Sequence, residues 1–326
     1  MAPDIADITI VGAGLLAARQ LGQAANDVVR SARVVFCSTT NIGIADYVRA
    51  VNPTAEIRFS EKNEYQVGMY RPDMYRRMAQ VVVDAARAGP GVVMLAPGSA
   101  VVVDAVTQCI LDAAASDGLR VRLLPGISSI EAVLAQVGYD VSRGLGIFLA
   151  QNLVLHRLQI DPSIASIVLQ PAYFDTLFFA GAPRSLAGRF DALEEQLART
   201  LTRDAPMALV ITANEEDGRP SVFWFRLGAL GRLHRVLSPR HTLFVPPARP
   251  VVSNDAFATR IASWDACRAR IDVDDNGTIR QMQRREIQGR ALDSDSDQDK
   301  EREGDVPSDL RQESTALAER WRLRRG

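Results

Sequence analysis

The chain has 326 residues, with a hydrophobic fraction of 47% and a charged fraction of 24%. This length is more than one average domain holds, and the composition is that of a globular protein rather than a disordered or fibrous one. The net charge of −1 gives no electrostatic reason to expect nucleic acid as a partner. The longest apolar stretch, residues 91–103, is interrupted at Pro97 and is too short for a membrane-spanning helix.

The cysteines and the first residues indicate a reducing compartment. Cys37, Cys109 and Cys267 lie far apart and have no Cys-x-x-Cys spacing, so neither a disulfide framework nor a zinc site is expected. Asp4 and Asp7 stand where a secretory signal needs positive charge. The histidines lack metal-ligand spacing, so we expect a cytoplasmic protein that binds no metal.

The apolar pattern predicts an α/β protein with two lobes and a tail. Short β-branched runs alternate with amphipathic stretches over residues 1–172, which is typical of a largely parallel sheet with crossover helices. A smaller, mixed α/β lobe is expected over residues 173–273. Residues 274–326 form a polar tail that is expected to be partly disordered, with residues 308–325 as either a mobile terminus or a short helix that docks on a partner chain.

The predicted elements follow in chain order. Strands are expected at residues 8–11, 34–37, 92–95, 121–123 and 167–169 in the first lobe, and at 176–179, 208–212, 222–225 and 242–245 in the second. Helices are expected to begin near residues 16, 41, 70, 100 and 128, and a further helix is expected over residues 185–200.

Three glycine-bearing turns follow strands of the first lobe. They contain Gly12 with Gly14, then Gly98, and then Gly126. Ligands of open α/β sheets bind at the carboxyl ends of the strands, so these turns predict a binding site. The first turn departs from a dinucleotide fingerprint, because Ala17 stands at the third glycine position and the next strand ends without an acidic residue.

A serine in the third turn is predicted to cap a helix. Ser128 stands three residues before Glu131, which is the spacing of a capping box. No G-x-S-x-G elbow surrounds this serine, so a cap is favoured over a nucleophile.

The three turns and the two-lobed pattern together resemble the tetrapyrrole methylase superfamily of S-adenosylmethionine-dependent methyltransferases. The resemblance covers about residues 7–250 and implies two α/β lobes around the methyl donor. In the middle turn, Ser99 and Ala100 replace the aspartate and proline common in that family. This change weakens porphyrin or corrin methylation as the expected activity.

The segment NEYQVGMYRPDMYRRM resembles, more specifically, the borosin-type peptide α-N-methyltransferases, which methylate backbone amides of a precursor peptide. The resemblance implies that Tyr65, Arg71 and Tyr75 are catalytic. It also implies S-adenosylmethionine as the donor, S-adenosylhomocysteine as the product and no metal. The positions expected to bind the donor are Gly12, Gly14, Pro97, Gly98, Ser99, Val102, Ser128, Ser129, Gln170, Thr212, His241 and Thr242.

The chemistry of amide methylation is consistent with these residue types. A peptide nitrogen shares its lone pair with the carbonyl group and is a poor nucleophile until its proton is removed. A tyrosine is a plausible base if a guanidinium stabilises its phenolate, and either Tyr65 or Tyr75 can take this role. Arg71 shares a face with Tyr75 if the helix begins by residue 71, and Pro72 is acceptable in a first turn.

A structural interpretation of the same helix stays open, since Tyr75, Met78 and Val82 share one helical face and would also form a core stripe.

The substrate is expected to be a separate ribosomal peptide. Fused borosin enzymes carry an apolar substrate at their own C-terminus, whereas this chain ends in ALAERWRLRRG after an acidic linker. We therefore expect a precursor peptide supplied in trans for ribosomal peptide (RiPP) biosynthesis and, by resemblance, a homodimer. Two alternatives remain. One is a small-molecule or tetrapyrrole methyltransferase whose pocket is lined by Tyr65 and Tyr75. The other is a non-catalytic binding module, which is suggested by Ser99 in place of the aspartate.

Overall fold

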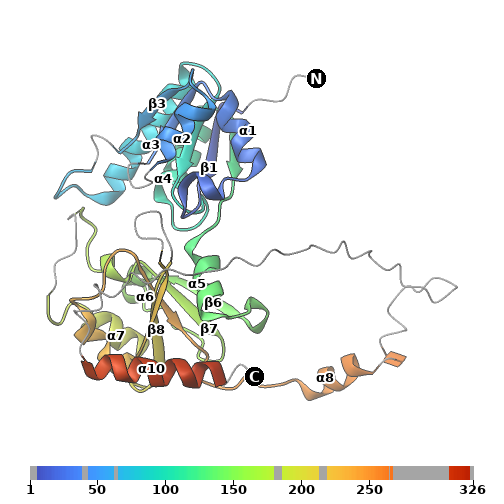
Figure 1. Cartoon of the computed structure of the whole chain (residues 1–326), viewed down its shortest axis with the longest axis vertical. Helices are drawn as coiled ribbons and strands as arrows, with labels where there is room; N and C mark the ends of the chain where they lie inside the picture. The colour runs from blue at the N-terminus through green and yellow to red at the C-terminus, as the bar shows by residue number, and fades with distance from the viewer. Residues whose placement is uncertain are drawn as a thin grey trace. The chain divides into compact units, whose positions relative to one another are not determined.

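The computed structural model describes residues 6–38, 43–61, 65–179, 186–212, 219–263, 265–266 and 308–323. The chain divides into two compact units, one made of residues 1–248 and 306–326 and the other of residues 249–305. The first unit contains two sheets of five described strands each (Figure 1). The predicted α/β fold, with a parallel first sheet and a mixed second sheet, is confirmed.

The first sheet is entirely parallel and has the strand order β3-β2-β4-β1-β5. Alternate side chains point to opposite faces, as the pleat of a strand requires. Ile10 and Met94 pack with helices α3 and α4, whereas Val35 and Leu95 pack with α1 and α2. Both faces of the central strands are therefore buried. The elements are β1 (Ile8–Gly12), η1 (Ala17–Gln20), α1 (Gln23–Ser31), β2 (Val34–Cys37), α2 (Ile44–Val51), β3 (Glu56–Phe59), α3 (Arg71–Arg87), β4 (Val92–Ala96), α4 (Ala105–Ser116) and β5 (Val121–Leu124).

The second sheet is mixed and has the order β6-β7-β10-β8-β9, in which only β6 and β7 are parallel neighbours. Leu153 and Leu193 bring α6 and α7 into one core cluster with Leu209 of β8, while Val133 of α5 packs in a second cluster with Val210. The elements are α5 (Ser129–Val137), η2 (Val141–Arg143), β6 (Leu145–Leu149), α6 (Ala150–Leu155), β7 (Ala165–Leu169), η3 (Pro171–Tyr173), α7 (Asp191–Leu197), β8 (Pro206–Ile211), β9 (Ser221–Arg226), η4 (Leu227–Leu233) and β10 (His241–Val245).

Several predicted strands differ from the observed ones. The strand predicted at residues 167–169 belongs to the second sheet, as β7, and not to the first. An apolar run that is buried on both faces has the same pattern in either sheet, so the sequence did not distinguish them. Strands β3 and β6 were not predicted, and residues 176–179 make only an isolated bridge between Phe178 and Tyr70 instead of a strand.

The helix starts near residues 70 and 128 agree with α3 and α5. Helix α4 begins later than expected, because the Asp104 side chain accepts hydrogen bonds from the backbone N–H groups of Val106 and Thr107 at 3.0 and 3.2 Å and so caps it. Of the helix predicted over residues 185–200, only Asp191–Leu197 is α-helical, and residue 185 lies outside the described residues.

The C-terminal segment is a helix that packs on its own chain. Helix α10 (Ser308–Leu323) contacts β9, an edge strand. The backbone N–H of Trp224 donates to Ser314 Oγ at 2.8 Å, and Arg226 forms an ion pair with Glu313. Leu310 and Leu317 are buried in the two core clusters of the second sheet. The helix thus covers a strand edge that would otherwise expose unpaired backbone groups. Residues 274–307 of the predicted tail lie outside the described residues.

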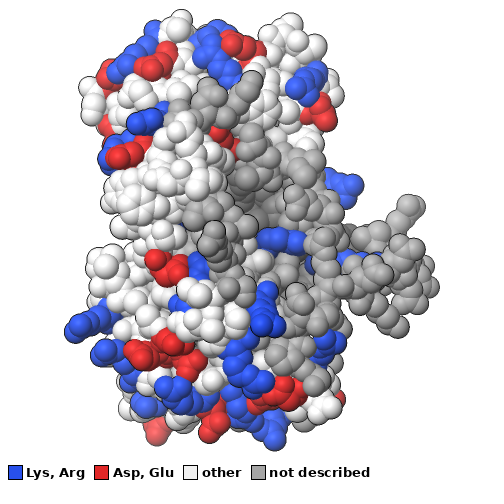
Figure 2. Space-filling model, turned by 90° about the vertical axis from the view of Figure 1, so that its left-hand side faces the viewer, with Lys and Arg blue, Asp and Glu red and all other residues white. Residues whose placement is uncertain are grey.

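The second unit contains helix α8 (Asp255–Ala262), which is exposed and is capped by Asn254 Oδ1 accepting from the Phe257 N–H at 3.0 Å. None of the helices that the structure describes is long and apolar enough to cross a membrane. Basic and acidic side chains are interspersed over the described residues of the face in Figure 2.

Candidate active site

The three glycine-bearing turns meet at one edge of the first sheet. They follow β1, β4 and β5, which are neighbours in the order β4-β1-β5. Gly14 and Gly98 exchange two backbone hydrogen bonds of 2.9 Å, and the Ala13 N–H donates to the Ala96 carbonyl at 2.8 Å. Parallel pairing of the strands therefore brings turns that are distant in sequence, such as those of Gly14 and Gly98, into one backbone surface.

Glycine is required where these turns touch. A Cβ atom on Gly12 would lie 2.4 Å from the Gly126 nitrogen and 2.8 Å from the Gly98 oxygen. A Cβ atom on Gly126 would lie 2.3 Å from the Gly12 oxygen. Gly14 and Gly98 also have φ angles of +74° and +70°, which residues with a side chain rarely adopt. The turns thus present bare backbone at the strand ends, where a ligand can approach closely.

The middle turn connects this edge to the second sheet. Pro97 is exposed, whereas Ser99 is buried and its carbonyl accepts the Val102 N–H at 3.1 Å. The Val102 side chain packs against the core cluster of α5 and the second sheet. The next residue, Val103, has a φ of 53°, which strains a β-branched residue. Backbone strain of this kind is concentrated at functional sites.

The third turn ends in the predicted capping box, which is confirmed. The Ile130 N–H donates to Ser128 Oγ at 3.1 Å, and the Ser128 N–H donates to Glu131 Oε2 at 3.0 Å. Ser128 is buried and Ser129 is half-buried. The Ser128 hydroxyl is therefore engaged in starting α5.

The other predicted donor-binding residues lie together at one edge of the second sheet. Gln170 follows the carboxyl end of β7, Thr212 follows that of β8, and His241 with Thr242 begins the antiparallel strand β10 between them. His241 is paired in register with Ile211. Gln170 has a φ of 53° directly before a proline, a position where left-handed backbone is unfavourable.

His241 is a buried, neutral histidine. Burial lowers its pKa to about 4, and the positive charge of Arg240 lowers it further. The Ser238 N–H donates to Nδ1 at 3.0 Å. Because Nδ1 is an acceptor, the proton of the neutral ring is on Nε2, which makes Nε2 a hydrogen-bond donor.

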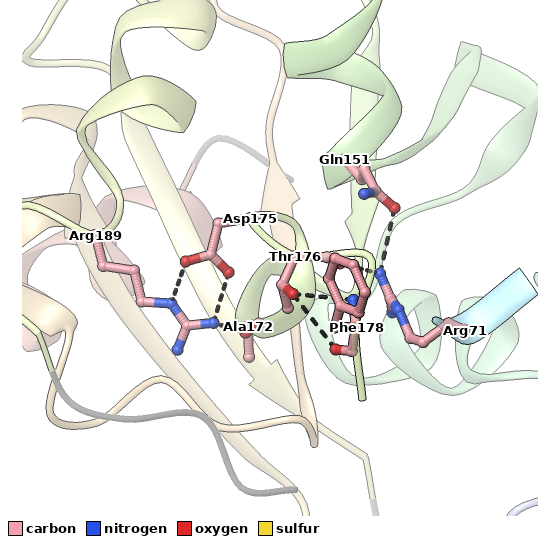
Figure 3. Close-up of polar contacts among 7 residues, drawn as sticks. All are labelled: Arg71, Gln151, Ala172, Asp175, Thr176, Phe178 and Arg189. Carbon is pink, nitrogen blue, oxygen red and sulfur yellow. Dashed lines mark hydrogen bonds and ion pairs between the residues drawn. The ribbon is translucent and has the colours of Figure 1, made fainter. Parts of the chain in front are cut away.

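Arg71 joins the start of α3 to the segment after η3. Its backbone N–H donates to the Leu177 carbonyl at 2.8 Å. Its Nη2 donates to the Thr176 carbonyl and reaches Gln151 Oε1 at 3.4 Å (Figure 3). The Nε of Arg71 is buried and has no hydrogen-bond partner among the described residues. A buried donor without an acceptor is costly, so this N–H is a candidate for binding a ligand oxygen.

The structure brings the predicted catalytic tyrosines together. Tyr65 and Tyr75 are close enough to interact electrostatically. The pKa of Tyr173 of η3 is raised chiefly by burial, and both Arg71 and Tyr75 interact electrostatically with this residue. Tyr75 is half-buried on α3, beside the fully buried Met78 of the same helix. The expected stabilisation of a Tyr65 phenolate is not found. Instead, partial burial of the side chain and then the negative charge of Glu61 raise the pKa of Tyr65 well above its ordinary value.

Several residues beside this cluster were missed from the sequence. Arg189 forms a two-pronged ion pair with Asp175, with N–O distances of 2.8 and 2.7 Å, and donates to the Ala172 carbonyl at 2.6 Å (Figure 3). This pair holds the segment whose Thr176 carbonyl binds Arg71. Glu61 follows β3, so recognising that strand would have marked it as a residue at a carboxyl end. A partner such as the Thr176 backbone carbonyl cannot be predicted from the sequence, because every residue has a carbonyl group whatever its side chain.

Among the described residues, no group of three or more His, Cys, Asp or Glu side chains is arranged to hold a metal ion.

Residues 7–217 match the family model of the tetrapyrrole (corrin/porphyrin) methylases. A methyltransferase/ribosomally synthesized type I borosin cyclic peptide precursor of Mycena rosella, mroMa1, is 26% identical over 249 residues, which are 74% of this chain and 60% of that protein. A type II borosin precursor of Phlebiopsis gigantea, pgiMA1, is 25% identical over 166 residues, 50% of this chain and 29% of that protein. The chain thus spans 60% or less of the length of these relatives.

Two solved structures share the fold. The uroporphyrin-III-C-methyltransferase from Thermus thermophilus aligns with a TM-score of 0.51 and 19% identity, over 74% of this chain and 92% of that one. The methyltransferase CobJ aligns with a TM-score of 0.50 and 13% identity, over 75% and 96%. The family match covers well over half of the chain. The protein therefore belongs to the tetrapyrrole (corrin/porphyrin) methylase family.

Proposed function

We propose that the protein uses S-adenosylmethionine to N-methylate backbone amides of a separate ribosomal peptide. The observation that carries the proposal is the buried Nε of Arg71, which has no acceptor among the described residues and lies in a cluster with Tyr75 and Tyr173. The borosin relatives, which are named as methyltransferases and peptide precursors, support a peptide as the substrate class.

The donor would lie at the glycine turns. The glycine turns pack closely on one another and carry no side chains at the strand ends, which fits a ligand that needs close contact with backbone. The neutral His241 offers an Nε2–H donor without adding positive charge near a sulfonium. When bound, S-adenosylmethionine supplies an electrophilic methyl group and needs no metal. The donor-binding residues in this proposal are Gly12, Gly14, Pro97, Gly98, Ser99, Val102, Ser128, Ser129, Gln170, Thr212, His241 and Thr242.

Arg71 and the tyrosines would activate the substrate amide. Removal of the N–H proton places negative charge on the carbonyl oxygen, because the amide is delocalised. The Arg71 Nε–H would donate to that oxygen and stabilise the charge as it develops. The contacts of Nη2 with Thr176 and Gln151 hold the guanidinium in place for this role. Tyr65 and Tyr75 would orient the amide and accept its proton.

The packing of α10 argues against this segment as the methylated peptide. Ser314 and Glu313 of this helix bond to residues of β9, and Leu310 and Leu317 are buried in the core. This segment would have to leave the fold before it could be methylated. By resemblance to the borosin enzymes we also propose a homodimer, which size-exclusion chromatography with light scattering tests directly.

The test is a methylation assay with the purified protein, isotope-labelled S-adenosylmethionine and a short apolar peptide encoded in a neighbouring reading frame. We expect mass steps of one methyl group each, located on backbone nitrogens by fragmentation. Arg71→Lys should lower kcat by about 100-fold, since lysine has no Nε–H fork to replace the guanidinium. Arg77→Lys, on an exposed position of the same helix, is the matched control.

The alternatives give different results. Methylation of a tetrapyrrole or another small molecule but not of peptides would refute the proposed substrate. Donor binding without methylation of any of these compounds would identify a binding module. Unchanged peptide methylation by the Arg71→Lys protein would refute the assigned role of the guanidinium.

A further inference from the structure

Tyr65 is unsuited to act as a base by itself. The Tyr65 side chain is 40% exposed, and its partial burial together with the charge of Glu61 raises its pKa, so the residue is a neutral phenol at physiological pH. A neutral phenol can accept a proton only if its own proton leaves at the same time. A proton acceptor must therefore lie next to the Tyr65 hydroxyl if this residue takes part in removing the amide proton.

Glu61 is in that position. Its side chain is 8% exposed and hydrogen-bonds to the Tyr65 hydroxyl. Ser38, which follows β2 and is also buried, donates its hydroxyl to Glu61 Oε1 at 2.6 Å. The Tyr65 backbone N–H donates to the Glu61 carbonyl at 3.3 Å. The buried carboxylate is thus tied to neighbouring strand ends and to the tyrosine, as burial of a charge requires.

The other groups that face Tyr65 do not offer this role. Tyr75 and Asp104 act on it electrostatically, and both raise its pKa. The carboxylate of Asp104 already accepts from two backbone N–H groups at the start of α4 and from the Thr107 hydroxyl at 2.8 Å. The Tyr65 ring is held by stacking on Phe179, with a centroid distance of 5.0 Å and an interplanar angle of 12°. Glu61 is the carboxylate that bonds to the hydroxyl.

We propose that Glu61 is the final acceptor of the amide proton, which reaches it through Tyr65. The inference rests on the proposed function. In the step, the S–CH3 bond of the donor breaks and an N–CH3 bond forms, while the sulfonium becomes a neutral thioether. The amide N–H proton passes to the Tyr65 oxygen, and the Tyr65 phenol proton passes to the Glu61 carboxylate. Glu61 ends as a neutral acid and later releases its proton to solvent, so atoms and charge balance.

The kinetic test compares wild-type protein with Glu61→Gln, which keeps the shape and a hydrogen-bond acceptor but removes the basic carboxylate. We expect kcat to fall by about 100-fold with little change in KM, and the decline of kcat at acid pH to disappear. Tyr65→Phe should cause a similar loss, and the double variant should be little worse than either single one. Glu56→Gln, an exposed position on β3, is the matched control.

A second readout needs no turnover. The ultraviolet titration of Tyr65, obtained as the difference between wild type and Tyr65→Phe, should move to lower pH in Glu61→Gln, because a negative charge beside the phenol is lost. An unmoved titration, or wild-type kcat and pH profile in Glu61→Gln, would overturn the inference alone. If the wild-type protein methylates no peptide, the proposed function fails and this role fails with it.

Discussion

The buried His241 makes the stability of the protein depend on pH. Its pKa is lowered from 6.5 to about 4, chiefly by burial, and its side chain is 8% exposed. In the unfolded chain the imidazole is solvated and takes up a proton near pH 6.5, about its ordinary value. The folded protein keeps the ring neutral down to about pH 4. Between these values the unfolded state binds one more proton than the folded state.

The sign and size of the effect follow from this difference. At pH 7 the ring is mostly neutral in both states, so little stability is lost. As the pH falls below about 6.5, proton binding favours the unfolded state, and the loss levels off below about pH 4. A difference of about 2.5 pKa units corresponds to about 3.4 kcal/mol at acid pH, of which about 2 kcal/mol is already lost at pH 5.

The measurement is urea unfolding, followed by circular dichroism, at about pH 7 and about pH 5. His241→Asn keeps an acceptor near the position of Nδ1 for the Ser238 N–H and does not titrate in this range. The drop in unfolding free energy between the two pH values should be about 2 kcal/mol smaller in the variant than in wild type. Equal drops in both proteins would refute the assignment of a buried, neutral His241.

Two further predictions concern packing. Gly12→Ala should lower Tm by about 6–12 °C in a thermal scan, because the added Cβ meets backbone atoms of two other turns and overpacking costs about 3 kcal/mol. Gly22→Ala is the control: its Cβ meets no atom within 4 Å, so Tm should change by less than about 3 °C. Leu310→Ala should cost about 2–5 kcal/mol in urea unfolding and speed proteolysis at α10, since the side chain is 1% exposed in the core of the second sheet; an unchanged digestion pattern would contradict this packing.

Features with local causes were predictable from the sequence. The capping box of Ser128 and Glu131 and the helix start at Arg71, with Pro72 in the first turn, are formed by neighbouring residues and appear where the sequence indicates them. The three glycine turns were also found, because a strand, a glycine and a helix follow one another along the chain. Their common edge follows from parallel pairing, whose strand ends point the same way.

The tertiary structure alone decided which residues surround the candidate catalytic tyrosines. The sequence placed β7 in the wrong sheet and missed β3, because apolar content does not identify a strand's neighbours. With β3 missed, Glu61 was not considered. Partial burial of Tyr65 and then the charge of Glu61 raise the pKa of Tyr65 instead of lowering it. Residue type and spacing indicate which chemistry is possible, whereas burial and long-range pairing determine the charge that each group carries.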